Sequence, residues 1–354
     1  MLRLEGLGST HTCNGLTRRD FLHRGLQAGC VGAGLFASGN AQAVGPFQRR
    51  GRRPVKAARL PIVDTHQHLW DLTKFTPPWL GGAPDVLRKS YTTEHFLKAT
   101  RGSNVVKAVY MEVDVDPKQQ VEEAEHVIRL SKNSDHPTVA AVISGRPNSA
   151  GFEAYITRYK DSPYIKGVRQ VLHPPETKQG LCLQPQFVKS MKLLGRLGKS
   201  YDICIRPTEL GDAVKLADQC PDTRFIIDHC GNADPKAFSK SKAAGAEEPW
   251  HQADPWRRSI EALAKRKNVI CKISGVVARA PEGWSSEDLA PIINHCLDQF
   301  GPDRVVFGGD WPVCRIAATY LQWVNALKEV IAERSLVDQK KLLHDNAVRL
   351  YGLS

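Results

Sequence analysis

The alternation of apolar, β-branched runs with amphipathic helical stretches is the feature that most constrains how this chain folds. From Leu60 onward, eight such pairs follow one another. Strands separated by helices run parallel, because each helix carries the chain back across the sheet. Eight is also the number of strands that closes into an α/β barrel of the (β/α)8, or TIM, type. The expected strands are 60–66, 104–113, 138–144, 164–171, 201–206, 223–229, 268–274 and 303–309.

Helices are expected between these strands and after the last of them. Asp116-Pro117 is typical of a helix start, because Asp caps the first turn, Pro fits the first helical position and Gln119 stands where a capping box needs it. A further helix is expected at 335–350. The other helices are expected at 93–101, 117–132, 149–160, 185–199, 208–219, 255–267, 286–299 and 317–333.

The size and composition of the chain allow one large domain behind a leader. It has 354 residues, of which 42% are hydrophobic, and this is enough for a sizeable core. No stretch approaches the roughly 18–20 uninterrupted apolar residues of a spanning helix, so an integral membrane protein is not expected. We predict a signal peptide at 1–43, a basic linker at 44–59 and a single TIM-barrel domain at 60–354.

The first 43 residues have the parts of a signal peptide in their usual order. Arg18-Arg19 is followed by Phe21, by a weakly apolar run from Gly25 to Gly39 and by the small-x-small cleavage site Ala41-Gln42-Ala43. The segment resembles a twin-arginine signal. That resemblance implies that the twin-arginine export machinery carries the folded protein to the periplasm. The alternative is a disordered extension in which the paired arginines occur by chance.

Most of the positive charge lies before the predicted domain. Residues 1–59 contain ten basic and two acidic side chains, so they account for +8 of the net charge of +12. A nucleic-acid partner would have to rest on the Arg49–Arg53 cluster, and no aromatic side chain is interleaved there. We interpret the cluster as a solvated linker and expect no nucleic-acid binding.

The cysteines form no recognisable metal or disulfide pattern. Seven of the nine lie beyond the leader, and because seven is odd they cannot all pair within one chain. Cys204, Cys230 and Cys271 fall in or beside apolar runs, which is typical of small core residues.

Two histidines leave the first strand together. The apolar start of the strand leads into His66, Gln67 and His68. Residues i and i+2 of a strand share a face. Both imidazoles can therefore point into the barrel mouth, which is the geometry for chelating one metal ion.

Polar residues also end the sixth and eighth strands. His229 follows the apolar run of the sixth strand, and Asp310 follows that of the eighth. The first and eighth strands are neighbours only in a closed barrel, so His66, His68 and Asp310 converge only if the barrel closes. A doubly wound open sheet, the alternative fold, would not bring them together. A lone histidine is more often structural, but this combination favours a functional site.

These residues recur within four longer segments, Asp64–Trp70, Asp228–Asn232, Lys272–Gly275 and Gly308–Pro312. Together the segments resemble the amidohydrolase-2 branch of the amidohydrolase superfamily, and its lactonase-like members most of all. The resemblance extends over about residues 60–352. It implies a TIM barrel that hydrolyses a carboxylic ester or lactone at the top of the barrel.

The resemblance also implies how the site residues are used. It makes His66, His68, His229 and Asp310 metal ligands, with His229 and Asp310 also catalytic. The chain lacks the strand-five histidine and the bridging lysine of two-metal members, since its fifth strand ends Ile205-Arg206-Pro207. At most one divalent metal, zinc, is therefore expected. Some lactonases of this branch work without metal, so a metal-free site stays open.

Asp310 is the expected general base whether or not the site holds a zinc ion. Asp310 accepts a proton from the attacking water. A zinc ion held by the histidines would lower the pKa of that water towards roughly 7 and polarise the carbonyl. Without the ion, the imidazoles and an arginine must polarise the carbonyl.

Three arginines are candidates for binding a small-molecule substrate. Arg146, Arg169 and Arg206 lie at or near the ends of the third, fourth and fifth strands. A guanidinium fork suits a carboxylate or a polyhydroxy lactone. The alternative for each is a structural ion pair. Trp70 and Trp311 can stack on a sugar face, or they can simply pack the loops.

The remaining polar residues are interpreted as supporting ones. Lys272 is expected to be a buried partner for carboxylates. Glu112 lies at the end of the second strand. The sequence leaves two roles open for it, a ligand or hydrogen-bond acceptor at the site and a plain salt bridge. His173, His251 and His344 stand alone in the sequence, and we expect them to be structural or exposed.

The sequence thus predicts an exported (β/α)8 hydrolase that opens a sugar-derived or carboxylated lactone. A decarboxylase is the closest enzymatic alternative, because related barrels use the same His and Asp set on carboxylated substrates. The alternative from another class is a barrel that binds a ligand without catalysis. The intact Asp310 argues against it, because a pure binder need not keep an acid among histidines. The particular lactone and the oligomeric state stay open.

Overall fold

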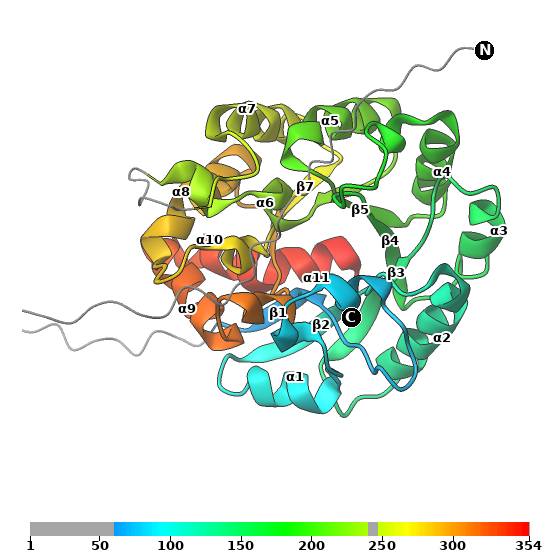
Figure 1. Cartoon of the computed structure of the whole chain (residues 1–354), viewed down its shortest axis with the longest axis horizontal. Helices are drawn as coiled ribbons and strands as arrows, with labels where there is room; N and C mark the ends of the chain where they lie inside the picture. The colour runs from blue at the N-terminus through cyan, green and yellow to red at the C-terminus, as the bar shows by residue number, and fades with distance from the viewer. Residues whose placement is uncertain (1–59, 240–246, 354) are drawn as a thin grey trace, which may run out of the picture. The chain divides into compact units, whose positions relative to one another are not determined.

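Eight parallel strands lie in sequence order around one sheet in a computed structural model that describes residues 60–239 and 247–353 (Figure 1). All eight predicted strands are present, most of them trimmed by one to three residues at their ends. Five of them are buried along their whole length, which suits continuous apolar runs covered on both faces. They are β1 (Ile62–Gln67), β2 (Val105–Met111), β3 (Thr138–Ser144), β4 (Ile165–Val171), β5 (Ser200–Cys204), β6 (Phe225–Ile227), β7 (Val269–Ile273) and β8 (Val305–Phe307).

The sheet closes on itself between its first and last strands. The backbone N–H of Asp310 donates to the carbonyl oxygen of His66 at 2.8 Å, and that of His68 donates to the carbonyl oxygen of Trp311 at 2.8 Å. Gln67 and Trp311 form a parallel bridge at the same place. The closed barrel confirms the (β/α)8 prediction and excludes the doubly wound sheet.

The helices surround the barrel as Figure 1 shows, and each of the main ones lies within a predicted helical stretch or within two residues of it, whereas the short α6 (His229–Asn232) was not predicted. One apolar cluster lies between strands and helices. A second cluster includes Val63, Val142 and Ile226 of the strands. The main helices are α1 (Thr93–Ala99), α2 (Gln120–Ser131), α3 (Phe152–Thr157), α4 (Pro185–Arg196), α5 (Leu210–Gln219), α7 (Ala253–Ala264), α8 (Ser286–Phe300) and α9 (Tyr320–Val330).

The predicted C-terminal helix is broken into three pieces. These are α10 (Leu336–Lys340), a π-helical turn (Lys341–Asp345) and α11 (Asn346–Tyr351). Ala347 and Tyr351 of α11 join the same cluster as the strand residues Val63 and Ile226. The last helix therefore covers one end of the barrel interior, and the irregular turn lets it reach that position.

The first turn after β2 differs from the expected capping box. Asp116 does cap it, since its carboxylate accepts a hydrogen bond from the N–H of Lys118 at 2.9 Å, but Pro117–Gln119 is a 3-10 turn before α2. The Gln119 side chain does not reach back to the cap. It accepts from the N–H of Thr76 at 2.8 Å and donates to the carbonyl of Lys74 at 3.0 Å. Gln119 thus holds the long loop after β1.

Long connections follow the carboxyl ends of β1 and β6. The chain divides into the units Met1–Lys56 and Ala57–Ser354, and all elements named here lie in the second. Within residues 60–239 and 247–353, no helix combines the length and apolarity that a bilayer span requires. The predicted signal peptide and linker lie outside the described residues.

Candidate active site

The four residues predicted at the barrel mouth do come together. The ring of His66 lies 4.8 Å from that of His68 and 4.5 Å from that of His229, measured between centroids. Oδ1 of Asp310 lies 3.5 Å from Nε2 of His68 and 3.7 Å from Nε2 of His66. Strands that are distant in sequence thus place three imidazoles and one carboxylate around one point, as barrel closure requires.

The backbone at two of these residues has an unusual conformation. His229 has a φ of 54° and Asp310 a φ of 52°, values in the left-handed region that non-glycine residues rarely adopt. Such conformations concentrate at functional sites, where the surrounding structure compensates their cost. Gly275 makes room for one of them, because a Cβ at that position would lie 2.2 Å from Nδ1 of His229.

Hydrogen bonds orient two of the rings. Nδ1 of His68 lies 3.0 Å from the carbonyl oxygen of Met111, so Nδ1 carries the proton and Nε2 keeps its lone pair towards Asp310. Nδ1 of His229 lies 2.9 Å from the hydroxyl of Ser274 on the loop after β7. Groups that do not themselves face the cavity, the Met111 carbonyl and the Ser274 hydroxyl, therefore set the orientation of these two rings.

Burial decides the protonation of the site. It lowers the pKa of His68 to about 3 and that of His229 to about 4, and it lowers the pKa of His66 well below its usual range. The three imidazoles are therefore neutral at neutral pH. Burial raises the pKa of Asp310 to about 6, against the opposing influence of His229 and Arg169. Asp310 is thus ionised at neutral pH but still basic enough to take a proton.

A buried charge network beneath the histidines escaped the sequence analysis in part. Nζ of Lys272 lies 2.5 Å from Asp202 and 3.0 Å from Asp228, so Lys272 is the partner for carboxylates that we expected. Asp228 in turn lies 3.5 Å from Nδ1 of His66. Burial alone would raise the pKa of Asp228, but Lys272 and His66 hold it well below its usual range. The position of Asp228 directly before His229 was the available signal for it.

Arg169 belongs both to this network and to the site. Its Nε lies 2.6 Å from Glu112 and its Nη1 lies 3.5 Å from Asp228, which gives Glu112 a salt-bridge role. Nη1 also lies 3.2 Å from Nε2 of His66. The two interpretations of Arg169, ion pair and site residue, therefore apply together.

A cavity of about 300 Å³ opens above these groups. Its lining includes two residues that the sequence analysis did not place there, Arg279 and His173. Arg279 lies with its guanidinium 4.0 Å above the ring of Trp250, and it forms no ion pair with any described residue. His173 also lines the cavity, although we expected it to be structural or exposed. Trp79, which the sequence left open between lining the pocket and packing the loops, lines it too. The polar and aromatic lining comprises His68, Trp79, Asp114, Arg169, His173, His229, Asn232, Arg279 and Asp310.

Two of the predicted substrate-binding arginines do not line this cavity. The guanidinium of Arg146 lies 2.6 Å from the carboxylate of Asp114. Arg206 pairs with Glu209 and donates to the carbonyl of Pro174 at 2.7 Å. Both are held by groups on neighbouring loops, so the structural alternative describes them.

The two predicted aromatic residues are also away from the cavity. Trp70 and Trp311 are each 1% exposed. Trp70 donates to the carbonyl of Lys89 at 2.6 Å, and both indoles pack edge-on against Tyr91. They anchor the loop after β1 beneath the surface, which leaves no ring face for a sugar.

The donor set at the barrel mouth fits one divalent ion. His66, His229 and Asp310 each place a ligand atom within 4.8 Å of the other two. Neutral imidazoles and a carboxylate are the ligands that zinc prefers in proteins. Nε2 of His68 is available as a further donor. Arg169 would have to move aside for Nε2 of His66 to bind an ion, because its Nη1 now donates to that nitrogen.

The chain is similar to several known proteins. It is 26% identical over 298 residues to an L-fucono-1,5-lactonase of Burkholderia multivorans, with 82% of this chain and 96% of the other covered. It is 28% identical over 310 residues to the uncharacterised protein y4mH of Sinorhizobium fredii, with 82% and 98% covered. A crystal structure of a Burkholderia multivorans amidohydrolase with bound zinc shares the fold, with a TM-score of 0.70, 22% identity, and 83% and 100% covered.

A family model gives the broader assignment. The model described as Amidohydrolase matches residues 63–353, which include almost the whole barrel and all four residues at its mouth. Together with the closed eight-stranded barrel, this match decides the question of family. The chain belongs to the amidohydrolase family.

Proposed function

We propose that this protein hydrolyses the ester bond of a lactone that is sugar-derived or carboxylated. The observation that carries the proposal is Asp310, a buried carboxylate that lines the cavity beside three neutral imidazoles and whose pKa burial raises to about 6. A group of this basicity can take a proton from water at neutral pH. The similarity to an L-fucono-1,5-lactonase supports the choice of a lactone.

In this proposal Asp310 accepts a proton from the water that attacks the lactone carbonyl. The imidazole of His68 cannot donate to the substrate through Nε2, because its proton is on Nδ1 towards Met111. Arg169, whose Nη1 lies 3.2 Å from Nε2 of His66, is the group that stabilises the developing oxyanion. His229, at the end of β6, helps to orient the water or the carbonyl.

A divalent ion, zinc in the first instance, would be held by His66, His68, His229 and Asp310. When bound, such an ion acidifies water and polarises a carbonyl. The zinc found with the similar Burkholderia structure supports this part of the proposal.

The charge of the cavity favours a substrate rich in oxygen. Arg279 lines the cavity with no carboxylate partner among the described residues, and burial lowers its pKa. A half-buried guanidinium without a carboxylate partner gains from an anionic or strongly polar ligand. We therefore assign Arg279, together with Arg169, to substrate binding.

The test is a panel of sugar lactones and carboxylated lactones, followed with a pH indicator and compared with the Asp310→Asn variant. Acid release that depends on Asp310 is the expected result. Release of carbon dioxide from a carboxylated substrate would instead identify a decarboxylase. Binding of a lactone without any turnover would identify the non-catalytic barrel.

We also propose export by the twin-arginine route, on the basis of the leader sequence. The cysteines of the described body support folding before export. Cys182, Cys204, Cys220, Cys230, Cys271, Cys296 and Cys314 are all free and at most 2% exposed. Thiols that are buried before export are protected from an oxidising compartment.

A further inference from the structure

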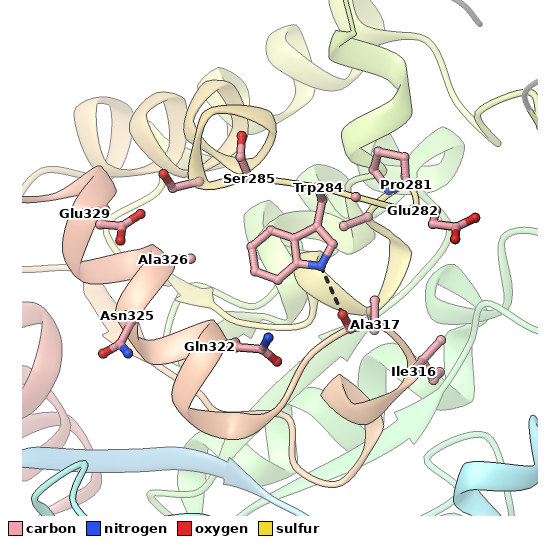
Figure 2. A pocket seen from close by; sticks show the side chains of 14 residues that line it. Pro281, Glu282, Trp284, Ser285, Ile316, Ala317, Gln322, Asn325, Ala326 and Glu329 are labelled. Carbon is pink, nitrogen blue, oxygen red and sulfur yellow. Dashed lines mark hydrogen bonds between the residues drawn. The ribbon is translucent and has the colours of Figure 1, made fainter. Parts of the chain in front are cut away.

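A second and larger pocket lies beside the catalytic cavity. It has a volume of about 770 Å³ and is formed by the segment after β7 on one side and by α9 on the other. Figure 2 shows Trp284 between these two sides, with its indole N–H donating to the carbonyl of Ala317 at 3.0 Å. This bond fixes the ring, which is half-buried, at the centre of the pocket.

The two spaces share part of their walls. Ala278 and Ile316 line both the catalytic cavity and the outer pocket. Ile316 is 42% exposed, so its apolar side chain stands at the surface where the two spaces meet. A molecule bound in the inner cavity can therefore extend past Ile316 into the outer pocket.

One face of α9 supplies polar groups to the outer pocket. Gln322, Asn325 and Glu329 are spaced i, i+3 and i+7, which places them on the same side of a helix, and Figure 2 shows them on the α9 side of Trp284. The carboxamide oxygen of Gln322 accepts from the N–H of Thr319 at 2.7 Å. Its NH₂ group forms no hydrogen bond with a residue in the described ranges.

Three further polar side chains of the outer pocket have no partner among the described residues, whereas the hydroxyl of Ser285 donates to the carboxylate of Asp288 at 3.2 Å. Asn325, Glu329 and Glu282 form no hydrogen bond or ion pair with any residue of 60–239 or 247–353. Two carboxylates line the pocket, and no described Lys or Arg does. The inner cavity, by contrast, contains Arg169 and Arg279. The electrostatic preference thus changes from anionic groups inside to uncharged hydroxyl-rich groups outside.

We propose that the outer pocket is a subsite for a second sugar unit attached to the lactone that is hydrolysed in the inner cavity. The proposal rests on the proposed lactonase function and extends it to glycosylated lactones. An indole face offers an apolar surface on which a sugar ring can lie. Amides and carboxylates around it accept and donate to sugar hydroxyls. The glycosidic bond stays intact, since only the inner cavity holds the hydrolytic groups.

The first test compares glucono-1,5-lactone with cellobiono-1,5-lactone as substrates of the full-length protein. We expect kcat/KM to favour the disaccharide lactone by about tenfold, which corresponds to one or two well-made hydrogen bonds. The double variant Asn325→Ala/Glu329→Ala should lose this preference. Glu333→Ala, an exposed carboxylate just after α9 that does not line the pocket, is the matched control and should keep it.

The second test does not depend on turnover. Binding of cellobionate and gluconate, the product acids, is measured by calorimetry with the wild type and the same variants. Tighter binding of cellobionate that only Asn325→Ala/Glu329→Ala abolishes supports the subsite. Equal binding of the two acids, or an unchanged preference in that variant, overturns the subsite. Absence of lactone hydrolysis with an intact binding preference would overturn the proposed function and leave the subsite standing.

Discussion

The backbone N–H of Asp310 donates a hydrogen bond of 2.8 Å to the carbonyl oxygen of His66. This bond joins the end of β8 to the end of β1. The side chains of the same two residues meet above it, with Oδ1 of Asp310 3.7 Å from Nε2 of His66. The same contact between the ends of β1 and β8 therefore both closes the barrel and brings His66 and Asp310 together in the site.

Replacing Asp310 by Asn should cost a hundredfold or more in kcat, because Asn cannot accept a proton from water; about 10²–10⁴ is typical for a general base. Lactone turnover by the purified variant is the measurement. Asp222→Asn, an exposed position without partners among the described residues, is the control and should keep full activity. An unchanged kcat in a folded Asp310→Asn variant would remove Asp310 from the mechanism.

The same variant should be more stable than the wild type at neutral pH. A folded-state pKa of about 6 means that Asp310 holds its proton more tightly when folded than when unfolded. Its charge therefore costs stability as pH rises from about 4 to above 6, by about 3 kcal/mol at pH 7. Thermal unfolding should show a higher Tm for Asp310→Asn at pH 7, and the difference should shrink below pH 4. A lower Tm at pH 7 would contradict this account.

The pH profile of kcat/KM should show one inflection near pH 6. Asp310 must be ionised to act, so the rate should fall about tenfold per pH unit below that value. The pKa values of His68 and His229, at about 3 and 4, add no second inflection near neutrality. The slow spontaneous rate, measured with Asp310→Asn, is subtracted. A flat profile between pH 4.5 and 7 would exclude Asp310 as the base.

The double variant His66→Ala/His68→Ala should lose about a hundredfold or more in turnover, whether the site uses an ion or only its own dipoles. Elemental analysis separates the two cases. If an ion is held, the variant should also lose bound zinc, and chelators should inactivate the wild type. If none is held, chelators should leave the wild type active. His344→Ala, on the C-terminal helical segment, is the control, and full activity of the double variant would defeat both cases.

Lys272→Met should destabilise the fold by about 3–5 kcal/mol, because it leaves Asp202 and Asp228 as uncompensated buried carboxylates. Urea unfolding measures the loss. Lys267→Met, at an exposed position, should change stability by about 0.5 kcal/mol or less. A Lys272→Met protein as stable as the control would show that the network carries no net energy.

Changing Arg18-Arg19 to Lys-Lys should retain the precursor in the cytoplasm, because the translocase reads the arginine pair. Cell fractionation followed by immunodetection is the measurement. The same change at Arg49-Arg50, in the predicted linker, is the control and should be exported normally. A Lys-Lys precursor that still leaves the cytoplasm would rule out the twin-arginine route.

The sequence by itself determined the barrel and its central residues. Strands and helices are encoded locally, by apolar periodicity, and the positions of His66, His68, His229 and Asp310 at strand ends follow from that register. Parallel strands all place their carboxyl ends at one face. The convergence of these four residues was therefore predictable without any knowledge of side-chain contacts.

The tertiary structure alone decided which loop residues line the cavity. Arg146 and Arg206 look equivalent to Arg169 in the sequence, yet Asp114 on another loop holds Arg146 away from the cavity and Glu209 in the same turn holds Arg206, whereas Arg169 lines the cavity. Arg279 reaches the cavity by lying over Trp250, a contact across 29 positions of the chain. Loop conformation depends on such contacts and not on periodicity, and for that reason the loop residues that line the cavity could not be read from the order of amino acids.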